Sequence, residues 1–526
     1  MARSTIGLRM GAGVAAAAVA LGVVQLTAAF FSPAADARTA VGTAVINATP
    51  GPVKEWAILT FGTADKLFLS VAVIAVIGVL AAVAAIWERS RIPVGSVAFL
   101  LAAVAGSAAV LARPGAGLVD IIPTLLGAVC GIAVLRLLTS GRIVDGRSSD
   151  GRASDGRTTD VSNDASDDAG VDTGRRLSLA TLGFAGLGLL GGVAGVVITR
   201  RLHSVSGDRD TFALPSAAPP SPVPADVTPN GVQLPSFITG NGDFYRIDTA
   251  LSVPQLSRAD FRLRIHGMVD REITYTFDDL KKFEPIEKVV TLTCVSNPVG
   301  GDLISNATWT GYRVRDLLRD SGIHTDADMV LSTSVDGFTA GTPVEALTDS
   351  RDAILAIGMN GVPLPVEHGY PARLVVPGLY GYVSATKWVV DLELTRFDRV
   401  QAYWTKLGWS ERGPIKTESR IDVPRDSQKV AKGPATFGGV AWAQNRGVKA
   451  VEVRIDDGPW QPAQLGASYS NDTWRLWSFP WTATQSGLHT ITVRATDNTG
   501  AVQTPDQAPP APDGATGWHS VSFEVA

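Results

Sequence analysis

Residues 289 to 301 read Val289-Val290-Thr291-Leu292-Thr293-Cys294-Val295-Ser296-Asn297-Pro298-Val299-Gly300-Gly301. The β-branched residues before Cys294 predict a strand, and the proline and glycines after it predict a loop. A soft thiolate at the end of a strand, beside a loop of small residues that a ligand can approach, suits a transition metal. The residues alone leave a second interpretation open, in which Cys294 is a small buried hydrophobic side chain.

Short periodic runs on both sides of this stretch predict a domain of mixed α and β structure. A short helix is expected at 313–318, and strands at 261–265, 288–294, 329–335, 354–357, 373–376 and 387–394. After about residue 403 the helical periods stop, and short strands recur at 436–442, 448–455, 474–481 and 489–495. Short strands at such regular spacing favour a β-sandwich.

The first 200 residues are the most apolar part of the chain. Of the 526 residues, 45% are hydrophobic and 18% are charged, which is too apolar for one ordinary soluble enzyme. Five stretches are long enough to cross a bilayer: 10–31, 67–87, 94–111, 118–137 and 177–198. The lipid bilayer is therefore an expected partner, and a net charge of −4 gives no basic surface for nucleic acid. A cleaved signal peptide is the alternative for the first stretch.

Positive charges in the short loops predict the orientation of these spans. Arg and Lys precede span one, join spans two and three, and join spans four and five, so these segments are expected in the cytoplasm. The loop 141–176, with Asp-Gly-Arg repeats and an acidic run, predicts disorder, and the Pro-rich segment 201–239 predicts an extended linker. The expected localisation is a multi-pass cell-membrane protein whose large C-terminal part is extracytoplasmic.

An arginine pair precedes the fifth span. The segment Gly174-Arg175-Arg176-Leu177-Ser178-Leu179 resembles a twin-arginine export signal, and the span that follows is rich in glycine. The alternative is an ordinary positively charged flank on the cytoplasmic side.

Several segments accompany the cysteine loop in a specific order: Trp309-Thr310-Gly311, then His368-Gly369-Tyr370-Pro371-Ala372-Arg373-Leu374-Val375-Val376-Pro377-Gly378, then Lys387-Trp388. Together with the loop at Cys294 they resemble the sulfite oxidase family of molybdopterin enzymes. The remainder resembles the immunoglobulin-like dimerisation domain of many members, and the spans resemble membrane-anchored actinobacterial versions. The implied fold is multi-domain: a five-helix transmembrane anchor (1–200), a linker (201–239), a mixed α+β molybdopterin domain (240–397) and an immunoglobulin-like β-sandwich (398–526).

The resemblance implies a molybdenum-molybdopterin cofactor, with Cys294 as the catalytic thiolate that binds the metal. The residues that it places at the cofactor are Tyr245, Arg246, Ser334, His368, Arg373, Ser384, Ala385, Thr386 and Lys387. Arginine suits such a site because its planar guanidinium binds phosphate bidentately. Taken singly, each residue has an ordinary structural interpretation, such as a turn histidine or a surface charge, and their joint order is what favours the cofactor.

Two departures from the family pattern bear on the substrate. Sulfite-oxidising members typically carry an arginine pair just after the Cys-x-x-Asn segment, where this chain has Pro298 and Val299. Phe338 occupies a region that often supplies an active-site tyrosine. Without these groups a site loses charge-assisted hydrogen bonds worth about 1.5 to 3 kcal/mol each. The expected activity is oxygen-atom transfer on a small or protein-borne substrate, with sulfoxide-type reduction favoured over sulfite oxidation.

Electrons are expected to enter or leave the enzyme through a separate molecule, and not through the membrane anchor. The five spans contain no histidine, so they are interpreted as an anchor rather than as a haem site. Electron transfer is expected with a separate redox partner, a quinol or a cytochrome. Five tryptophans in the sandwich favour a homodimer, with a single core cluster as the alternative for most of them: Trp442, Trp460, Trp474, Trp477 and Trp481. A noncatalytic membrane-anchored surface receptor or adhesion module, which would use the β-sandwich, is the alternative function.

Overall fold

The computed structural model describes residues 2–50, 53, 65–89, 93–113, 116–140 and 165–526. These residues divide into two compact units, Met1–Ser204 and Val205–Ala526. Residues 141–164 of the predicted disordered loop lie outside the described residues. The rest of that loop forms the first turns of helix α7 (Ala165–Leu202), where disorder was expected. The apolar span provides a formed helix, and further turns extend from it at little cost.

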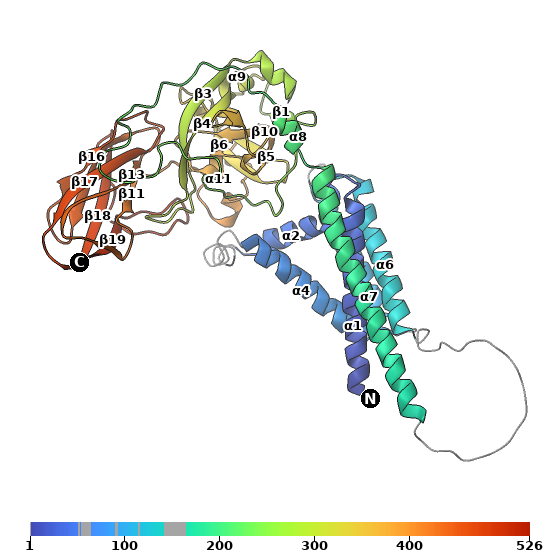
Figure 1. The fold of residues 1–526 in the computed structure, drawn as a ribbon. Coiled ribbons are helices and arrows are strands. Elements are labelled where there is room, and N and C mark those ends of the chain that lie inside the picture. Colours follow the sequence, from blue (N-terminus) through green and yellow to red (C-terminus); the bar gives the residue numbers. More distant parts are fainter. Residues whose placement is uncertain (1, 51–52, 54–64, 90–92, 114–115, 141–164) are drawn as a thin grey trace, which may run out of the picture. The chain divides into compact units, whose positions relative to one another are not determined.

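The first unit is a bundle of helices (Figure 1). They are α1 (Ala2–Ala28), α2 (Ala37–Ala48), α4 (Asp65–Ile86), α5 (Val94–Leu111), α6 (Ile122–Thr139) and α7, with 3-10 turns η1 (Pro33–Ala35) and η3 (Leu118–Ile121). Within the described residues, five helices are long and apolar enough to cross a membrane: Ile6–Ala28, Phe68–Ile86, Val94–Leu111, Leu118–Thr139 and Arg175–Asp210. They confirm the five predicted apolar helices.

Small residues let α1 pack closely inside this bundle, against α7, α6 and α4. A Cβ built on Gly22 would lie 2.2 Å from the carbonyl oxygen of Gly188, so α1 and α7 approach backbone to backbone. Ala15 and Ala16 of α1 are fully buried, whereas Leu190 of α7 is 68% exposed. Close packing through small residues, with large apolar side chains facing outward, is the arrangement expected of helices in lipid.

The second unit begins with two β-sheets, which together we name the two-sheet domain. One sheet has the order β2-β1-β10-β5-β6, and the other has the order β3-β4-β7-β8 with β9 also paired to β7. The strands are β1 (Arg262–Gly267), β2 (Ile273–Thr276), β3 (Pro285–Thr293), β4 (Ile304–Arg313), β5 (Met329–Ser334), β6 (Thr339–Pro343), β7 (Ile354–Met359), β8 (Val362–Pro363), β9 (Arg373–Val375) and β10 (Val389–Thr395). Strand β1 pairs parallel with β10, and the other pairs are antiparallel.

Short helical segments precede, connect and follow these strands. They are α8 (Ser206–Asp210), η5 (Asp278–Lys282), α9 (Val314–Arg319), α10 (Val344–Thr348), η6 (Val366–His368), α11 (Gly381–Ser384) and η7 (Thr405–Leu407). The predicted helix at 313–318 is α9, and the predicted strand at 288–294 is β3, which ends one residue before Cys294. The mixed α and β structure expected from the sequence is confirmed.

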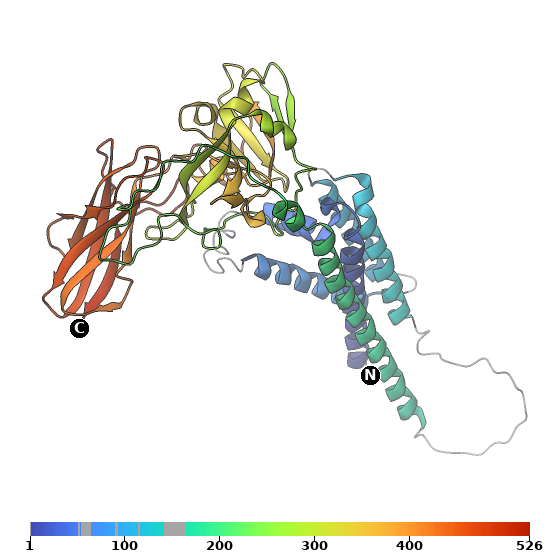
Figure 2. The same ribbon diagram turned by 45° about the horizontal axis from the view of Figure 1, so that its top comes forward.

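The rest of the chain forms a two-layer β-sandwich, which we name the sandwich (Figure 2). One sheet contains β11 (Glu418–Val423), β13 (Gly433–Trp442), β17 (Arg475–Ala483) and β16 (Gln464–Leu465). The other contains β12 (Gln428–Val430), β19 (His519–Val525), β18 (Gly487–Asp497), β14 (Val448–Ile455) and β15 (Gln461–Pro462). Phe437, Trp477 and Phe523 pack between the layers, which confirms the predicted sandwich.

Most of the tryptophans of the sandwich are used in packing. Trp442, Trp474 and Trp477 are at most 3% exposed. Trp442 and Trp474 join an apolar cluster that also holds residues of the two-sheet domain, so the two domains share a core. Trp460 is half-buried and packs edge-on against Trp518, at 4.9 Å between ring centroids. Packing in the core, the alternative to a homodimer contact, therefore accounts for three of the five tryptophans.

The segment predicted as an extended linker packs along the second unit. Val205, Val227 and Phe237 are at most 7% exposed and belong to its apolar clusters. The Arg209 guanidinium donates to the carbonyls of Pro363 and Leu364, each at 2.9 Å. Apolar residues spaced through the Pro-rich composition allow an irregular chain to bury surface, so the segment lies on the domain instead of acting as a free spacer.

Candidate active site

Cys294 is the first residue after β3, at the start of a tightly closed loop. Its backbone N–H donates to the Leu303 carbonyl at 3.0 Å, and its own carbonyl accepts from the Asn297 N–H at 3.1 Å. The residue is 9% exposed and forms no disulfide. Burial raises the pKa of the Cys294 thiol, while hydrogen bonds from the Ser296 amide and hydroxyl oppose that shift. The loop thus shields the sulfur and already supplies two donors for a thiolate.

Arg373, the first residue of β9, is a buried cation. It is 6% exposed, and its guanidinium donates to the carbonyls of His368 (3.2 Å), Leu374 (3.3 Å) and Ala385 (3.3 Å). It also stacks over the Trp309 ring at 5.1 Å. Burial lowers the pKa of Arg373 to about 10. Within the described chain no carboxylate pairs with this guanidinium, so a buried positive charge stands ready for an anionic group.

His368 lies beside Arg373 and is 3% exposed. Its Nε2 is 3.2 Å from the Asn241 carbonyl, which can only accept, so Nε2 carries the proton and Nδ1 is the acceptor. Burial and the positive charges of Arg373 and Lys387 lower the pKa of His368 to about 4. The imidazole is therefore neutral at physiological pH.

Lys387 and Arg246 meet at one buried carboxylate, that of Asp248. The Lys387 ammonium donates to Asp248 Oδ2 at 2.8 Å and to the Glu367 carbonyl at 3.1 Å. Arg246 Nε donates to the same Asp248 oxygen at 3.0 Å, while its side chain is 40% exposed. Burial lowers the pKa of Lys387 to about 8, and Asp248 opposes that shift. Asp248, which the sequence analysis did not single out, thus fixes two of the predicted site residues.

Tyr245 lies on the same side of the domain as the thiol. Its ring stacks on Phe244 at 5.3 Å, and its backbone N–H donates to Ser305 Oγ at 3.2 Å. Burial raises the pKa of Tyr245, a negative charge on Cys294 raises it further, and Arg373 opposes both. Tyr245 therefore lies within electrostatic range of both Cys294 and Arg373, as expected for a group at a shared site.

The remaining predicted residues use their polar groups inside the fold. Ser384 Oγ donates to the Tyr380 carbonyl at 2.9 Å, and Thr386 Oγ1 lies 2.7 Å from Ser332 Oγ. Ser334 is 1% exposed, and its Oγ accepts from the Asp336 N–H at 3.5 Å. Ala385 contributes its carbonyl to Arg373. The structure thus gathers Cys294, Tyr245, His368, Arg373, Ala385 and Lys387, whereas the side chains of Ser334, Ser384 and Thr386 are engaged elsewhere.

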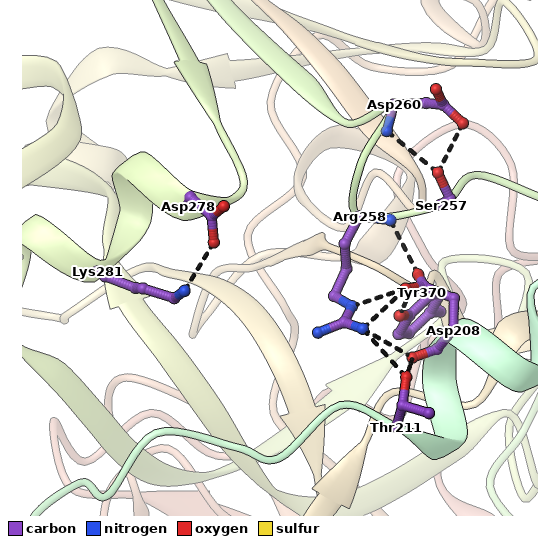
Figure 3. A network of polar contacts seen from close by, with 8 residues as sticks. All are labelled: Asp208, Thr211, Ser257, Arg258, Asp260, Asp278, Lys281 and Tyr370. Atoms are coloured by element: carbon purple, nitrogen blue, oxygen red, sulfur yellow. Dashed lines mark hydrogen bonds and ion pairs between the residues drawn. The ribbon is translucent and has the colours of Figure 1, made fainter.

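A cluster with an ion pair fixes the beginning of the second unit to the loop that carries His368 and Arg373. The Asp208 carboxylate accepts from Arg258 Nη2 at 2.8 Å and from the Tyr370 hydroxyl at 2.7 Å (Figure 3). These bonds lower the pKa of Asp208 against the opposing effect of burial. Because Tyr370 lies between His368 and Arg373 in the chain, the cluster stabilises the conformation that brings those two side chains together.

The donor set fits a molybdenum-pterin cofactor. A shielded thiol, a buried guanidinium without a carboxylate partner and a neutral imidazole provide one soft ligand and two groups for polar recognition. Asn297, three residues after Cys294, adds a buried side-chain Nδ2 that finds no hydrogen-bond partner. The sequence around Asn297 indicates no role for this side chain, because an unpartnered amide is visible only in three dimensions.

Comparisons with known proteins identify a molybdopterin-binding family in the part of the chain that holds these residues. Residues 250–404 match the family described as "Oxidoreductase molybdopterin binding domain", and residues 418–493 match "Bacterial Ig domain". "Uncharacterized oxidoreductase YuiH" of Bacillus subtilis is 31% identical over 153 residues, which cover 29% of this chain and 74% of that protein. The chain belongs to the sulfite oxidase family of molybdopterin oxidoreductases. It is an enzyme of that family, and its cofactor is molybdenum-molybdopterin.

Further proteins match a longer part of the chain. Mitochondrial sulfite oxidase of Homo sapiens is 30% identical over 324 residues, which cover 52% of this chain and 58% of that protein. This chain spans 58% to 62% of the length of the first curated relatives that it matches. The crystal structure of the sulfane dehydrogenase SoxCD from Paracoccus pantotrophus has 25% sequence identity and a TM-score of 0.49, covering 56% of this chain and 84% of that chain. Membership in an enzyme family sets aside the alternative of a noncatalytic receptor.

Proposed function

We propose that this member of the sulfite oxidase family transfers an oxygen atom to or from a small or protein-borne substrate, and that it reduces sulfoxide-type substrates in preference to oxidising sulfite. The observation that carries the proposal is the chemistry of the loop after Cys294. Pro298 is exposed and Val299 is half-buried there, and neither side chain can bind an anion. Phe338 packs on Tyr403 at 5.9 Å between ring centroids and offers no hydroxyl. The absence of anion-binding groups at these three positions favours an uncharged substrate over sulfite.

In this proposal the chain's residues bind and orient the cofactor. When bound, the molybdenum cofactor supplies two-electron oxygen-atom transfer. Cys294 is the protein thiolate, and the closed loop around it excludes water from the sulfur. Arg373 holds an anionic group of the pterin, with its guanidinium oriented by the carbonyls of His368 and Ala385. Neutral His368 offers Nδ1 as a hydrogen-bond acceptor, because its proton is on Nε2, which donates to the Asn241 carbonyl.

Substrate preference tests the proposal directly. Purified, cofactor-loaded protein is expected to reduce methionine sulfoxide, with a reduced viologen dye as electron donor, at least about tenfold faster than it oxidises sulfite with ferricyanide. The reason is that sulfite finds no cation in place of the missing arginine pair. The variant Val299→Arg should shift the preference toward sulfite. Faster oxidation of sulfite than reduction of the sulfoxide by the unmodified protein would contradict the proposal.

We also propose that the second unit is exported, already folded, by a twin-arginine route. Arg175 and Arg176 lie within α7, ahead of its glycine-rich apolar part. Replacing both with lysine keeps the charge but loses the guanidinium geometry. The double variant is expected to leave the folded second unit in the cytoplasm while the first four spans still insert.

Protease accessibility from outside the cell measures the outcome. The matched control is the double replacement Arg200→Lys and Arg201→Lys at the other end of α7, which should leave export unchanged. Normal external accessibility of the second unit in the Arg175→Lys, Arg176→Lys variant would rule out this export route.

The anchor and the sandwich carry the remaining proposals. We infer that electrons pass to or from a quinol or a cytochrome, and that two copies associate through the sandwich. Trp460 and Trp518 support the second inference, because they are the half-buried aromatic pair that core packing leaves at the sandwich surface.

A further inference from the structure

Loops of the sandwich hold the strand that leads to Cys294. Strand β3 lies at the end of its sheet, so one of its edges is open to partners from other parts of the chain. The Thr291 N–H donates to the Asp472 carbonyl at 3.0 Å, and the Thr291 carbonyl accepts from Gln444 Nε2 at 3.3 Å. Gln444 Nε2 also donates to Thr293 Oγ1 at 3.0 Å. The sandwich therefore continues the hydrogen bonding of β3 as far as the residue before Cys294.

This contact between β3 and the sandwich is buried. Thr291, Thr293 and Gln444 are at most 1% exposed. The Trp474 N–H donates to Thr291 Oγ1 at 2.8 Å, and Thr291 Oγ1 donates to Asn306 Oδ1 at 2.9 Å. Hydrogen bonds are stronger in the low dielectric of a protein interior than in water. These bonds therefore hold the end of β3 in one position against the sandwich.

The sandwich also holds the far end of the loop that begins at Cys294. Arg420 of β11 donates from Nη1 to the Gly301 carbonyl at 2.9 Å. Its Nε donates to Asp422 Oδ1 at 2.8 Å, so a second bond orients the guanidinium. Arg420 is 8% exposed. A planar, buried set of donors thus fixes the backbone of the loop at Gly301.

His519, the first residue of β19, packs against the neighbouring Gly300. A Cβ built on Gly300 would lie 2.3 Å from Cδ2 and Nε2 of the His519 ring, so this close approach requires glycine. The Ile421 N–H donates to His519 Nδ1 at 3.0 Å and holds the ring in place. Burial, with the nearby charge of Arg420, lowers the pKa of His519 to about 4, so the ring is neutral and Nδ1 can accept. Two consecutive residues of the loop therefore contact the sandwich.

Hydrogen bonds within the loop connect Gly301 to Cys294. The Gly301 N–H donates to the Pro298 carbonyl at 2.9 Å. The Leu303 N–H donates to Asn297 Oδ1 at 2.9 Å, and the Cys294 N–H donates to the Leu303 carbonyl at 3.0 Å. The loop is therefore a closed unit, in which a displacement of Gly301 also moves the residue that carries the thiol.

We propose that the sandwich is part of the catalytic unit, in which Gln444 and Arg420 are positioning residues that hold the two ends of the Cys294 loop and so fix the thiol relative to the cofactor. The proposal rests on the proposed function in taking Cys294 as the metal thiolate. Loops are mobile unless a rigid element supports them, and the groups behind a metal ligand orient that ligand. The sandwich thus acts on the site of its own chain, whether or not two copies associate.

The reactivity of the Cys294 thiol in the cofactor-free full chain tests this support. In Arg420→Met the Gly301 carbonyl loses its donor, so the loop should open more often and iodoacetamide should alkylate Cys294 at least about tenfold faster. Mass spectrometry of the peptides measures the rate, with Cys130 of α6 as the internal reference. Arg475→Met is the matched control and should leave the rate unchanged, because Arg475 donates to carbonyls of the sandwich itself. Equal rates in Arg420→Met and the unmodified protein would overturn the proposal.

Hydrogen exchange on the unmodified full chain provides a readout that does not depend on the folding of a variant. The N–H groups of Cys294, Gly301 and Leu303 are hydrogen-bonded and should be protected. As denaturant is added, residues 294–303 should lose this protection together with β11, because the loop opens when the sandwich releases it. Protection of the loop that persists after β11 has opened would contradict the proposal.

The loaded enzyme tests the effect on molybdenum. In Arg420→Met, kcat for methionine sulfoxide should fall about tenfold to a hundredfold with KM unchanged, because Arg420 acts on the loop and not on the substrate. Arg420→Lys, which can still donate to Gly301, should recover part of kcat. The molybdenum reduction potential, which requires no substrate, should shift in Arg420→Met and Gln444→Met and stay constant in Arg475→Met. An unchanged potential in both variants, with full cofactor content, would overturn the proposal.

The proposed function and this role of the sandwich fail in different measurements. If the unmodified, loaded protein turns over no substrate, the proposed function is wrong. The alkylation rate and the hydrogen exchange, both measured without cofactor, then still decide whether the sandwich holds the loop.

Discussion

Replacing Cys294 with serine is expected to lower turnover by at least about a hundredfold, since changes that only touch a metal ligand's neighbours already cost up to that much. The hydroxyl is smaller and harder than the thiol, and it does not provide a soft ligand. The site is 9% exposed, and a serine there can still receive hydrogen bonds from Ser296, so the fold should persist. Molybdenum content and turnover in the methionine sulfoxide assay measure the effect.

Cys130→Ser provides the matched control for this change. Cys130 is the other cysteine of the chain and lies on α6 in the helical bundle, so its replacement should leave turnover unchanged. Circular dichroism of the second unit in both variants checks that the fold is retained. Full turnover in Cys294→Ser would show that the thiol is not the metal ligand.

Removing the Arg373 charge is expected to have opposite effects on cofactor retention and on the stability of the cofactor-free protein. The guanidinium is 6% exposed and is balanced by carbonyl groups and a ring, without a carboxylate among the described residues. In Arg373→Met, the bound pterin loses charge-assisted hydrogen bonds, and its affinity should fall by roughly tenfold to a hundredfold for each bond. Without cofactor, the variant no longer buries an uncompensated charge, so its melting temperature should equal or exceed that of the unmodified protein.

A second arginine supplies the control. Arg475 of β17 is also held by backbone carbonyls, those of Gly466 and Val448 at 2.9 Å, but it lies in the sandwich. Arg475→Met should keep the cofactor content of the unmodified protein. Pterin content after gel filtration and melting temperature with and without cofactor are the measurements. Equal pterin retention in both variants would remove Arg373 from the site.

The amino-acid sequence determined the order of the parts and the chemistry of the ligand. The length of each apolar stretch marks the five membrane-spanning candidates, because a helix needs about 20 apolar residues in succession to cross about 30 Å of hydrocarbon. β-branched residues mark β3, and a period-two run marks β14, because alternate side chains of a half-buried strand face the core. Cys294 in its loop, with the ordered segments that follow, was enough to name the family and its cofactor.

Tertiary structure alone decided which of the candidate residues act together. Arg373 and Lys387 look equivalent in the sequence, yet Asp248 neutralises Lys387 and leaves Arg373 without a carboxylate partner in the described chain. Composition predicted a free spacer at 201–239, but burial of Val227 and Phe237 docks that segment on the domain.

The contact between the sandwich and the strand before Cys294 gave no signal in the sequence, because Gln444 donates to Thr293, which lies 151 residues earlier in the chain. Local patterns report periodicity, length and side-chain chemistry. Desolvation and charge pairing arise from contacts between distant segments, and only the folded chain determines them.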